Sequence, residues 1–137
     1  MVGKRFFEPK SIAVIGASAK PGKIGFSLVK NLLDGQFLGK IYPINLNEEN
    51  ILGLKCQSSV LGVKADIDLA IIVVPAISVP DVLKDCGQKR IKYAIVISAG
   101  FSEVGTNGKL LQEKILKIAA ENKIRLLGPN CLGIISP

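Results

Sequence analysis

The sequence contains no histidine and no tryptophan, and only three of its 137 residues are cysteine. Without histidine, the chain lacks the commonest general base near neutral pH and the imidazole that usually accepts a phosphoryl group. The odd set of cysteines, Cys56, Cys86 and Cys131, has no metal-type spacing and favours reduced thiols over a disulfide framework. We therefore predict no catalytic residue and no metal site in this chain.

Long apolar runs are also missing. The run LAIIVVPAI (69–77) is too short to cross a bilayer and contains a proline, so we expect no membrane partner. The opening residues MVGKRFFEPKS turn polar after two phenylalanines and do not resemble a secretion signal, which favours the cytoplasm. The net charge of +7 favours an anionic partner, but scattered lysines and few aromatic residues argue against nucleic acid.

Apolar runs of strand length alternate with segments of helical period, a pattern typical of a parallel sheet covered on both faces. Helices are predicted between the strands, at 23–35, 78–89 and 106–122, whereas 46–67 is predicted to be a loop-rich crossover. The length suits a single domain. We predict an α/β fold with a doubly wound, five-stranded, Rossmann-like parallel sheet. Its strands are expected at 11–16, 40–45, 68–75, 92–98 and 124–128.

The segment VIGASAKPGKIG (14–25) joins the first predicted strand to the first long helix. In a dinucleotide fingerprint the second glycine would stand where this chain has Ser18. A Walker loop would need glycine in place of Ala17 and Ser or Thr in place of Ile24. Neither common nucleotide motif is therefore present.

The same segment still has the groups of a phosphate site. It offers a serine hydroxyl, two lysines (Lys20 and Lys23) and a helix start near Gly25, whose free amides would attract phosphate oxygens. The alternative is that its glycines only make a tight turn between strand and helix. The second strand ends in the neutral Asn45, which suits a phosphorylated ribose, although Glu48 and Glu49 follow closely and leave this open.

Six ordered blocks make the pattern more specific. They are FFEPKSIAVIGAS with PGKIG, GKIYPIN, ILGLKC, DLAIIVVPA, VISAGFSEVG and IRLLGPNCLGIISP. Together they resemble the coenzyme A (CoA)-binding domain of NDP-forming acyl-CoA synthetases, especially the ADP-forming acetyl-CoA synthetases, and more loosely the alpha chain of succinyl-CoA synthetase. The resemblance spans nearly all of the chain and implies that 1–137 is one CoA-binding domain.

The resemblance also implies which residues hold CoA. It places the phosphates at the glycine loop, the nucleotide near the second strand, and the adenine or the pantetheine arm along the third strand. It places the pantetheine arm along the fourth strand and the thiol near the fifth. A lysine that the family often has after the second strand is missing, and Lys20 and Lys23 are our candidates to replace it. The other implied residues are Gly16, Ala17, Ser18, Ile24 and Gly25 in the loop, then Asn45, Val74, Pro75, Ser98, Ala99, Gly100, Asn130 and Cys131.

Several of these residues have a purely structural alternative. Ser18 could cap its own turn, the two lysines could be solvated, Pro75 could simply end a strand, and Cys131 could be a packing residue. We interpret Glu103, which lies within the SAGFSEVG block, as a solvated loop charge.

In the family, acyl-CoA, ADP and phosphate give acid, CoA and ATP through an acyl phosphate and a phosphohistidine in other domains. A chain without histidine would be the part that holds CoA or acyl-CoA, not catalytic alone. It would be an N-terminal fragment or a subunit, with ligase-type and ATP-grasp domains or subunits as partners. Two other functions remain open: a stand-alone regulatory CoA-binding protein and an NAD(P)-binding redox or regulatory module.

Overall fold

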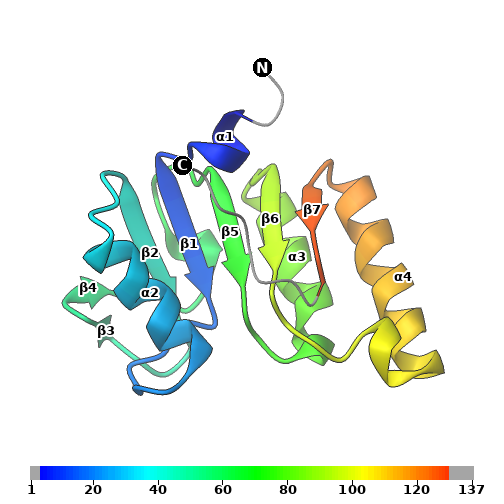
Figure 1. Ribbon diagram of the computed structural model, residues 1–137. Coiled ribbons are helices and arrows are strands. Elements are labelled where there is room, and N and C mark those ends of the chain that lie inside the picture. The colour runs from blue at the N-terminus through cyan, green and yellow to red at the C-terminus, as the bar shows by residue number, and fades with distance from the viewer. Residues whose placement is uncertain (1–3, 130–137) are drawn as a thin grey trace.

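A computed structural model describes residues 4–129 of the chain. Five parallel strands form one sheet in the order β2-β1-β5-β6-β7 (Figure 1). The strands are β1 (Ser11–Ile15), β2 (Lys40–Ile44), β5 (Leu69–Ile72), β6 (Tyr93–Val96) and β7 (Arg125–Leu127). The helices are α1 (Lys4–Phe7), α2 (Ile24–Asp34), α3 (Val79–Gln88) and α4 (Thr106–Glu121). The predicted α/β fold with a five-stranded parallel sheet is confirmed.

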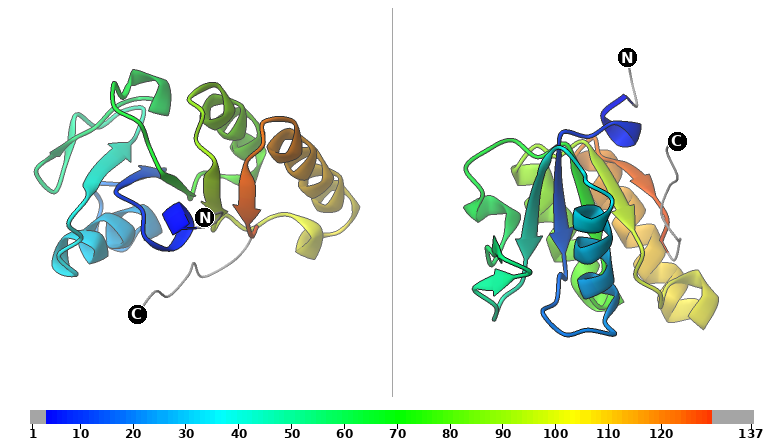
Figure 2. Two further views of the ribbon diagram at one scale, coloured as in Figure 1. Left: turned by 90° about the horizontal axis from the view of Figure 1, so that it is seen from above. Right: turned by 60° about the vertical axis from the view of Figure 1, so that its left-hand side comes forward.

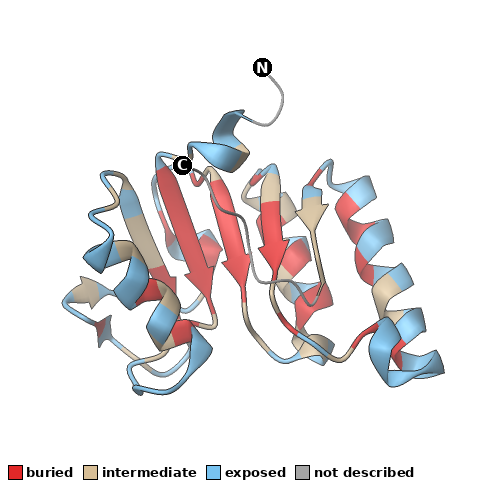
Figure 3. Ribbon diagram, in the orientation of Figure 1, coloured by how far each residue is buried: buried red, intermediate tan, exposed pale blue. Residues whose placement is uncertain are grey.

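The helices lie in layers on the two faces of the sheet. Helix α2 covers one face, and α3 and α4 cover the other (Figure 2). Every residue of β1 and β5 is buried (Figure 3), because these strands lie inside a sheet that is covered on both sides. Alternate strand residues therefore belong to two apolar clusters, with Val14 and Ile71 on the α2 face and Ile15 and Ile72 on the α3/α4 face.

The third strand and the crossover before it differ from the sequence prediction. The third predicted strand, β5, ends at Ile72, so Val74 and Pro75 lie in the loop after it, and a 3-10 turn (Ala76–Ser78) follows directly. The crossover predicted as loop-rich contains an antiparallel hairpin of β3 (Asn50–Ile51) and β4 (Leu54–Lys55). Strands of two residues carry no hydrophobic period, so no sequence pattern could reveal them.

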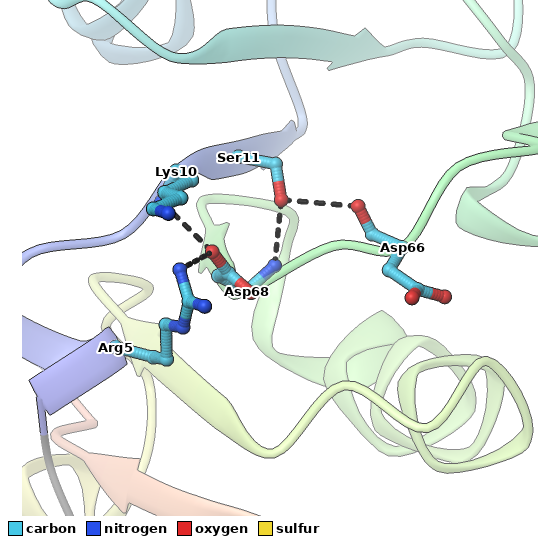
Figure 4. Close-up of polar contacts among 5 residues, drawn as sticks. All are labelled: Arg5, Lys10, Ser11, Asp66 and Asp68. Carbon is cyan, nitrogen blue, oxygen red and sulfur yellow. Dashed lines mark hydrogen bonds and ion pairs between the residues drawn. The ribbon is translucent and has the colours of Figure 1, made fainter.

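The amino edge of the sheet is held by a small polar network (Figure 4). The Asp68 carboxylate pairs with Arg5 of α1 at 3.4 Å and accepts a hydrogen bond from the Lys10 amide at 2.8 Å. The Ser11 hydroxyl donates to the Asp66 carbonyl and accepts from the Asp68 amide. These contacts join α1 and the start of β1 to the start of β5, so this edge is occupied by structural contacts.

Two of the cysteines lie within the described residues, and both are buried free thiols. Burial raises the pKa of Cys86 to about 12, and burial with the nearby Glu48 raises that of Cys56. Both thiols are therefore poor nucleophiles near neutral pH. Across residues 4–129, no helix has the length and apolarity to cross a bilayer, and no cluster of potential ligands could hold a metal ion.

Candidate functional site

The loop 16–23 leaves the carboxyl end of β1 and leads into α2 (Figure 1). In the sheet β1 lies between β2 and β5, and the chain runs from β1 to one side and later returns to the other. This change of direction is the place where parallel α/β sheets bind their ligands. The glycine loop therefore lies where a ligand is expected in a fold of this kind.

Gly16 and Gly25 let three backbone segments meet at this point. Gly16 has φ +98°, and a Cβ on it would lie 2.9 Å from the carbonyl carbon of Val73 in the loop after β5. A Cβ on Gly25 would lie only 2.1 Å from the carbonyl oxygen of Gly16. The first turn of α2 consequently sits directly on the end of β1, as the last glycine of a dinucleotide fingerprint allows in other folds.

The first turn of α2 offers unused hydrogen-bond donors. Its N-cap residue, Lys23, makes no side-chain capping bond, and its carbonyl accepts from the amides of Phe26 and Ser27 at 3.1 Å each. Among residues 4–129, no acceptor bonds the amides of Ile24 and Gly25. Two free amides at the positive end of an eleven-residue helix form a natural site for a phosphate oxygen.

Ser18 and Lys23 line the same hollow as Ile24 and Gly25, and Lys20 lies in the loop between them in sequence. The Ser18 hydroxyl oxygen accepts from the Lys20 amide at 3.0 Å, so Ser18 does cap its own turn. Its hydroxyl hydrogen remains able to donate to an anion, because a hydroxyl accepts and donates at once. Neither Lys20 nor Lys23 forms an ion pair within the described part of the chain, and both are exposed.

Asn45 braces the site from the end of β2. Its side-chain nitrogen donates to the Ala17 carbonyl at 2.7 Å. Its side-chain oxygen accepts from the amides of Asn47 at 2.7 Å and Glu48 at 3.0 Å. Both ends of the amide are thus committed within the protein, and Asn45 fixes the shape of the glycine loop.

A hollow of about 360 Å³ opens between these groups. It brings together seven of the residues predicted from the sequence, but Lys20 is not among those lining it. Gly22 and Val73 also line it and were not predicted; Gly22 stands in the quoted loop, whereas Val73 looks like any strand residue. The seven predicted lining residues are Gly16, Ala17, Ser18, Lys23, Ile24, Gly25 and Asn45.

The remaining predicted residues lie in the loops after β5 and β6. The Ser98 hydroxyl donates to the Val74 carbonyl, and a Cβ on Gly100 would lie 3.2 Å from the Ala76 methyl group, so the two loops touch. Ala99 and Pro75 are exposed in them. None of these residues lines the hollow beside the glycine loop. Asn130 and Cys131 lie outside the described residues.

Glu103, interpreted from the sequence as a solvated charge, does more than that. Its side chain is exposed, but its two oxygens accept hydrogen bonds from the amides of Gly100 and Phe101 at 2.8 Å each. The Gly100 amide, together with those of Glu103 and Phe101, lowers the pKa of the carboxyl group. No sequence signal marked this contact, because acidic residues are common in exposed loops.

A larger hollow, of about 470 Å³, lies elsewhere and is mostly apolar. It is lined by Phe6, Phe7 and Phe37 near the amino edge and by strand residues such as Ile71 and Ile95. Among the described residues that line it there is no lysine or arginine, and none belongs to the first turn of α2. Size alone would favour this hollow, but an anionic ligand needs the donors of the smaller one.

The comparison with known proteins agrees with the geometry. A family model described as CoA binding domain matches residues 10–137. The chain belongs to this family of CoA-binding domains. It is 56% identical over 128 residues to the acetate–CoA ligase (ADP-forming) of Methanocaldococcus jannaschii, covering 93% of this chain and 18% of that protein. It is 47% identical over 133 residues to subunit alpha of acetate–CoA ligase (ADP-forming) I of Pyrococcus furiosus, covering 94% and 29%.

A solved structure shows the same CoA-binding fold. The apo form of the dinucleotide-forming acetyl-coenzyme A synthetase 1 of Ca. Korarchaeum cryptofilum superposes with a TM-score of 0.92 at 44% identity, over 96% of this chain and 28% of that one. The family predicted from the sequence is thus confirmed, and the chain is a CoA-binding domain homologous to part of ADP-forming synthetases. It spans less than a third of the length of each of these relatives.

Proposed function

We propose that this chain holds CoA for an ADP-forming acyl-CoA synthetase, with the CoA diphosphate at the first turn of α2. The observation that carries the proposal is the pair of free amides at Ile24 and Gly25, two residues that line the hollow together with Lys23 and Ser18. The lysine offsets the negative charge of a phosphate, and the amides and the hydroxyl donate hydrogen bonds to its oxygens. Such a site requires no cluster of metal ligands. The relatives named as ADP-forming ligases support the reaction class.

The contribution of this domain to the reaction would be positional. If the phosphates are held at the carboxyl end of β1, the thiol at the far end of the pantetheine arm can reach only a limited volume around that point. This restriction converts a bimolecular encounter into an oriented one. Because the chain contains no histidine, a phosphorylated histidine and nucleotide site must come from ligase-type and ATP-grasp domains or subunits. We expect no acyl-CoA synthesis by this chain alone.

The pantetheine arm would run toward the loops after β5 and β6. Val74, Pro75, Ser98, Ala99 and Gly100 are our proposed residues along this path, since the two loops touch at the same edge of the sheet. Asn130 and Cys131 remain predictions for the thiol end. The cytoplasmic location also remains a prediction.

A thermal-shift series with CoA, acetyl-CoA, NAD, NADP and ATP tests the proposal. A ligand at 100 times its dissociation constant stabilises the folded state by about 2.7 kcal/mol, so CoA and acetyl-CoA should raise the melting temperature clearly. Stabilisation by NAD or NADP without any effect of CoA would overturn the proposal in favour of a dinucleotide-binding module. CoA binding without assembly with synthetase domains would favour the stand-alone regulatory protein.

The two loop lysines should contribute unequally to CoA affinity. Lys23 lines the hollow and Lys20 does not, so Lys23→Ala should weaken binding by about fivefold and Lys20→Ala by less than about twofold. Calorimetric titration measures both. Lys64→Ala, which removes an exposed lysine before β5, is the matched control and should leave affinity unchanged. Unchanged affinity in the Lys20/Lys23 double variant would remove both lysines from the site.

Replacing Asn45 by alanine should loosen the glycine loop. The substitution leaves the Ala17 carbonyl and the amides of Asn47 and Glu48 without their partner, which should cost about 2 kcal/mol of unfolding free energy. CoA affinity should fall by about tenfold, because the loop must then be ordered by the ligand. Urea unfolding and calorimetry provide the two values. Asn47→Ala removes a neighbouring exposed side chain as control, and equal behaviour of the two variants would contradict the bracing role.

A further inference from the structure

The loop after β6 contains a second group of amides that point to one place. The consecutive amides of Gly100 and Phe101 each donate to one oxygen of the Glu103 carboxylate at 2.8 Å. Successive amides that converge in this way form a small anion-binding concavity. Here the anion is supplied by the chain itself, two or three residues further on. The bonds are charge-assisted and therefore strong.

The same loop is anchored on both sides of this contact. Before it, the Ser98 hydroxyl donates to the Val74 carbonyl. After it, Phe101 is fully buried, and the Ser102 amide donates to the side-chain oxygen of Gln112 at 3.2 Å. Between these anchors lies the short segment Ala99–Gly100, and Gly100 has φ +105°. The Glu103 carboxylate is thus the contact that holds the exposed part of the loop in its shape.

The two loops at the carboxyl edge therefore differ in charge and in free donors. The loop before α2 has unbonded amides and lysines, whereas the loop after β6 has the amides of Gly100 and Phe101 bonded to a carboxylate of its own. A phosphate is attracted to the first loop and repelled by the second. A neutral chain such as the pantetheine arm pays no such electrostatic penalty at the second loop.

We propose that Glu103 is a positioning residue, which holds the 98–101 segment in the shape that receives the pantetheine arm and keeps phosphate groups away from its amides. The inference rests on the proposed function and adds a determinant of how CoA lies across the sheet edge. Glu103 does not touch the reacting atoms. It acts through the backbone of Gly100 and Phe101.

The test compares CoA with adenosine 3′,5′-bisphosphate, a fragment of CoA that lacks the pantetheine arm. In the 137-residue chain, Glu103→Gln should weaken CoA binding by about tenfold, because it removes the negative charge and replaces one of the two accepting oxygens by a nitrogen that can only donate. Binding of the fragment should change by less than about twofold. Glu113→Gln, an exposed position on α4, is the matched control and should bind both ligands as the wild type does.

Two further measurements separate positioning from damage to the fold. Amide exchange at Gly100 and Phe101 should speed up in Glu103→Gln, while exchange in β1 and α2 stays unchanged. Glu103→Asp keeps the charge on a shorter side chain and should restore part of the CoA affinity, so it also serves if the glutamine variant folds poorly. Equal weakening of both ligands, or unchanged CoA affinity with unchanged exchange, would overturn the inference. Failure of the wild type to bind CoA would instead overturn the proposed function.

Discussion

Replacing Gly25 by alanine should reduce CoA affinity by at least about 100-fold, because two hydrogen bonds to charged phosphate are lost together. The added Cβ would stand 2.1 Å from the Gly16 carbonyl oxygen and 3.0 Å from the Ala17 Cα, both of them backbone atoms. Such atoms cannot rotate out of the way as a side chain can. The first turn of α2 must therefore move off the end of β1, and its free amides move with it.

The same substitution should lower the free energy of unfolding by about 2 kcal/mol. Alanine favours a helix over glycine by about 1 kcal/mol, but forcing an atom into a packed site costs about 1–3 kcal/mol and more against backbone. The clash should prevail because its distance is far inside van der Waals contact. Urea unfolding measures the loss of stability, and calorimetry measures the loss of affinity.

Ser27→Ala is the control for Gly25→Ala. Ser27 lies in the same first turn of α2 and is exposed, so alanine there changes helix propensity without a clash. It should bind CoA as the wild type does. If Gly25→Ala also bound CoA normally, the phosphates could not depend on the close seating of α2, and the site would have to lie elsewhere.

Replacing Gly108 by alanine should lower the free energy of unfolding by about 3 kcal/mol. A Cβ at this position would lie 1.7 Å from the Phe101 carbonyl oxygen and 2.6 Å from a methyl carbon of Val104. Either α4 or the segment at Phe101 must then move. Phe101 is the largest of the fully buried side chains described, and loss of such a residue costs about 3–5 kcal/mol, which bounds the effect.

Urea unfolding with Asn107→Ala as control tests this second prediction. Asn107 is the exposed neighbour of Gly108 in the first turn of α4, and its replacement should leave stability within about 0.5 kcal/mol of the wild type. Wild-type stability in Gly108→Ala would mean that α4 can shift away from Phe101 at little cost. The Glu103 contact would then lose its rigid support as well.

The replacements of Gly25 and Gly108 are expected to have different main effects, on CoA binding and on stability respectively. Gly25 seats a helix whose amides remain free, so its replacement mainly removes binding. Gly108 seats a helix against a loop in which Glu103 already bonds the amides of Gly100 and Phe101, so its replacement mainly removes stability. The free amides of Ile24 and Gly25 and the bonded amides of Gly100 and Phe101 therefore lie in separate segments at the carboxyl ends of the strands.

Local patterns in the sequence were sufficient for the architecture. Runs such as SIAVIG and KYAIVIS have the composition of doubly covered strands, and the stripe Leu111, Ile115 and Ile118 has helical spacing. Both signals lie within a few neighbouring residues, so they can be detected before any fold is known. The position of the glycine loop followed from the same reasoning, because the order of strands and helices already implies where ligands bind.

The sequence by itself thus determined the parallel sheet and the helices α2, α3 and α4, and it predicted the loop before α2 as the place for an anion. Only the tertiary structure decided that Asn45 braces this loop through Ala17, a residue 28 positions earlier, and that Glu103 occupies the amides after β6. It also decided that Gly25 is needed for contact with Gly16. Hydrogen bonds and close approaches of this kind depend on which backbone atoms the fold brings together. Hydrophobic periodicity reflects only neighbouring residues, so it cannot predict these contacts.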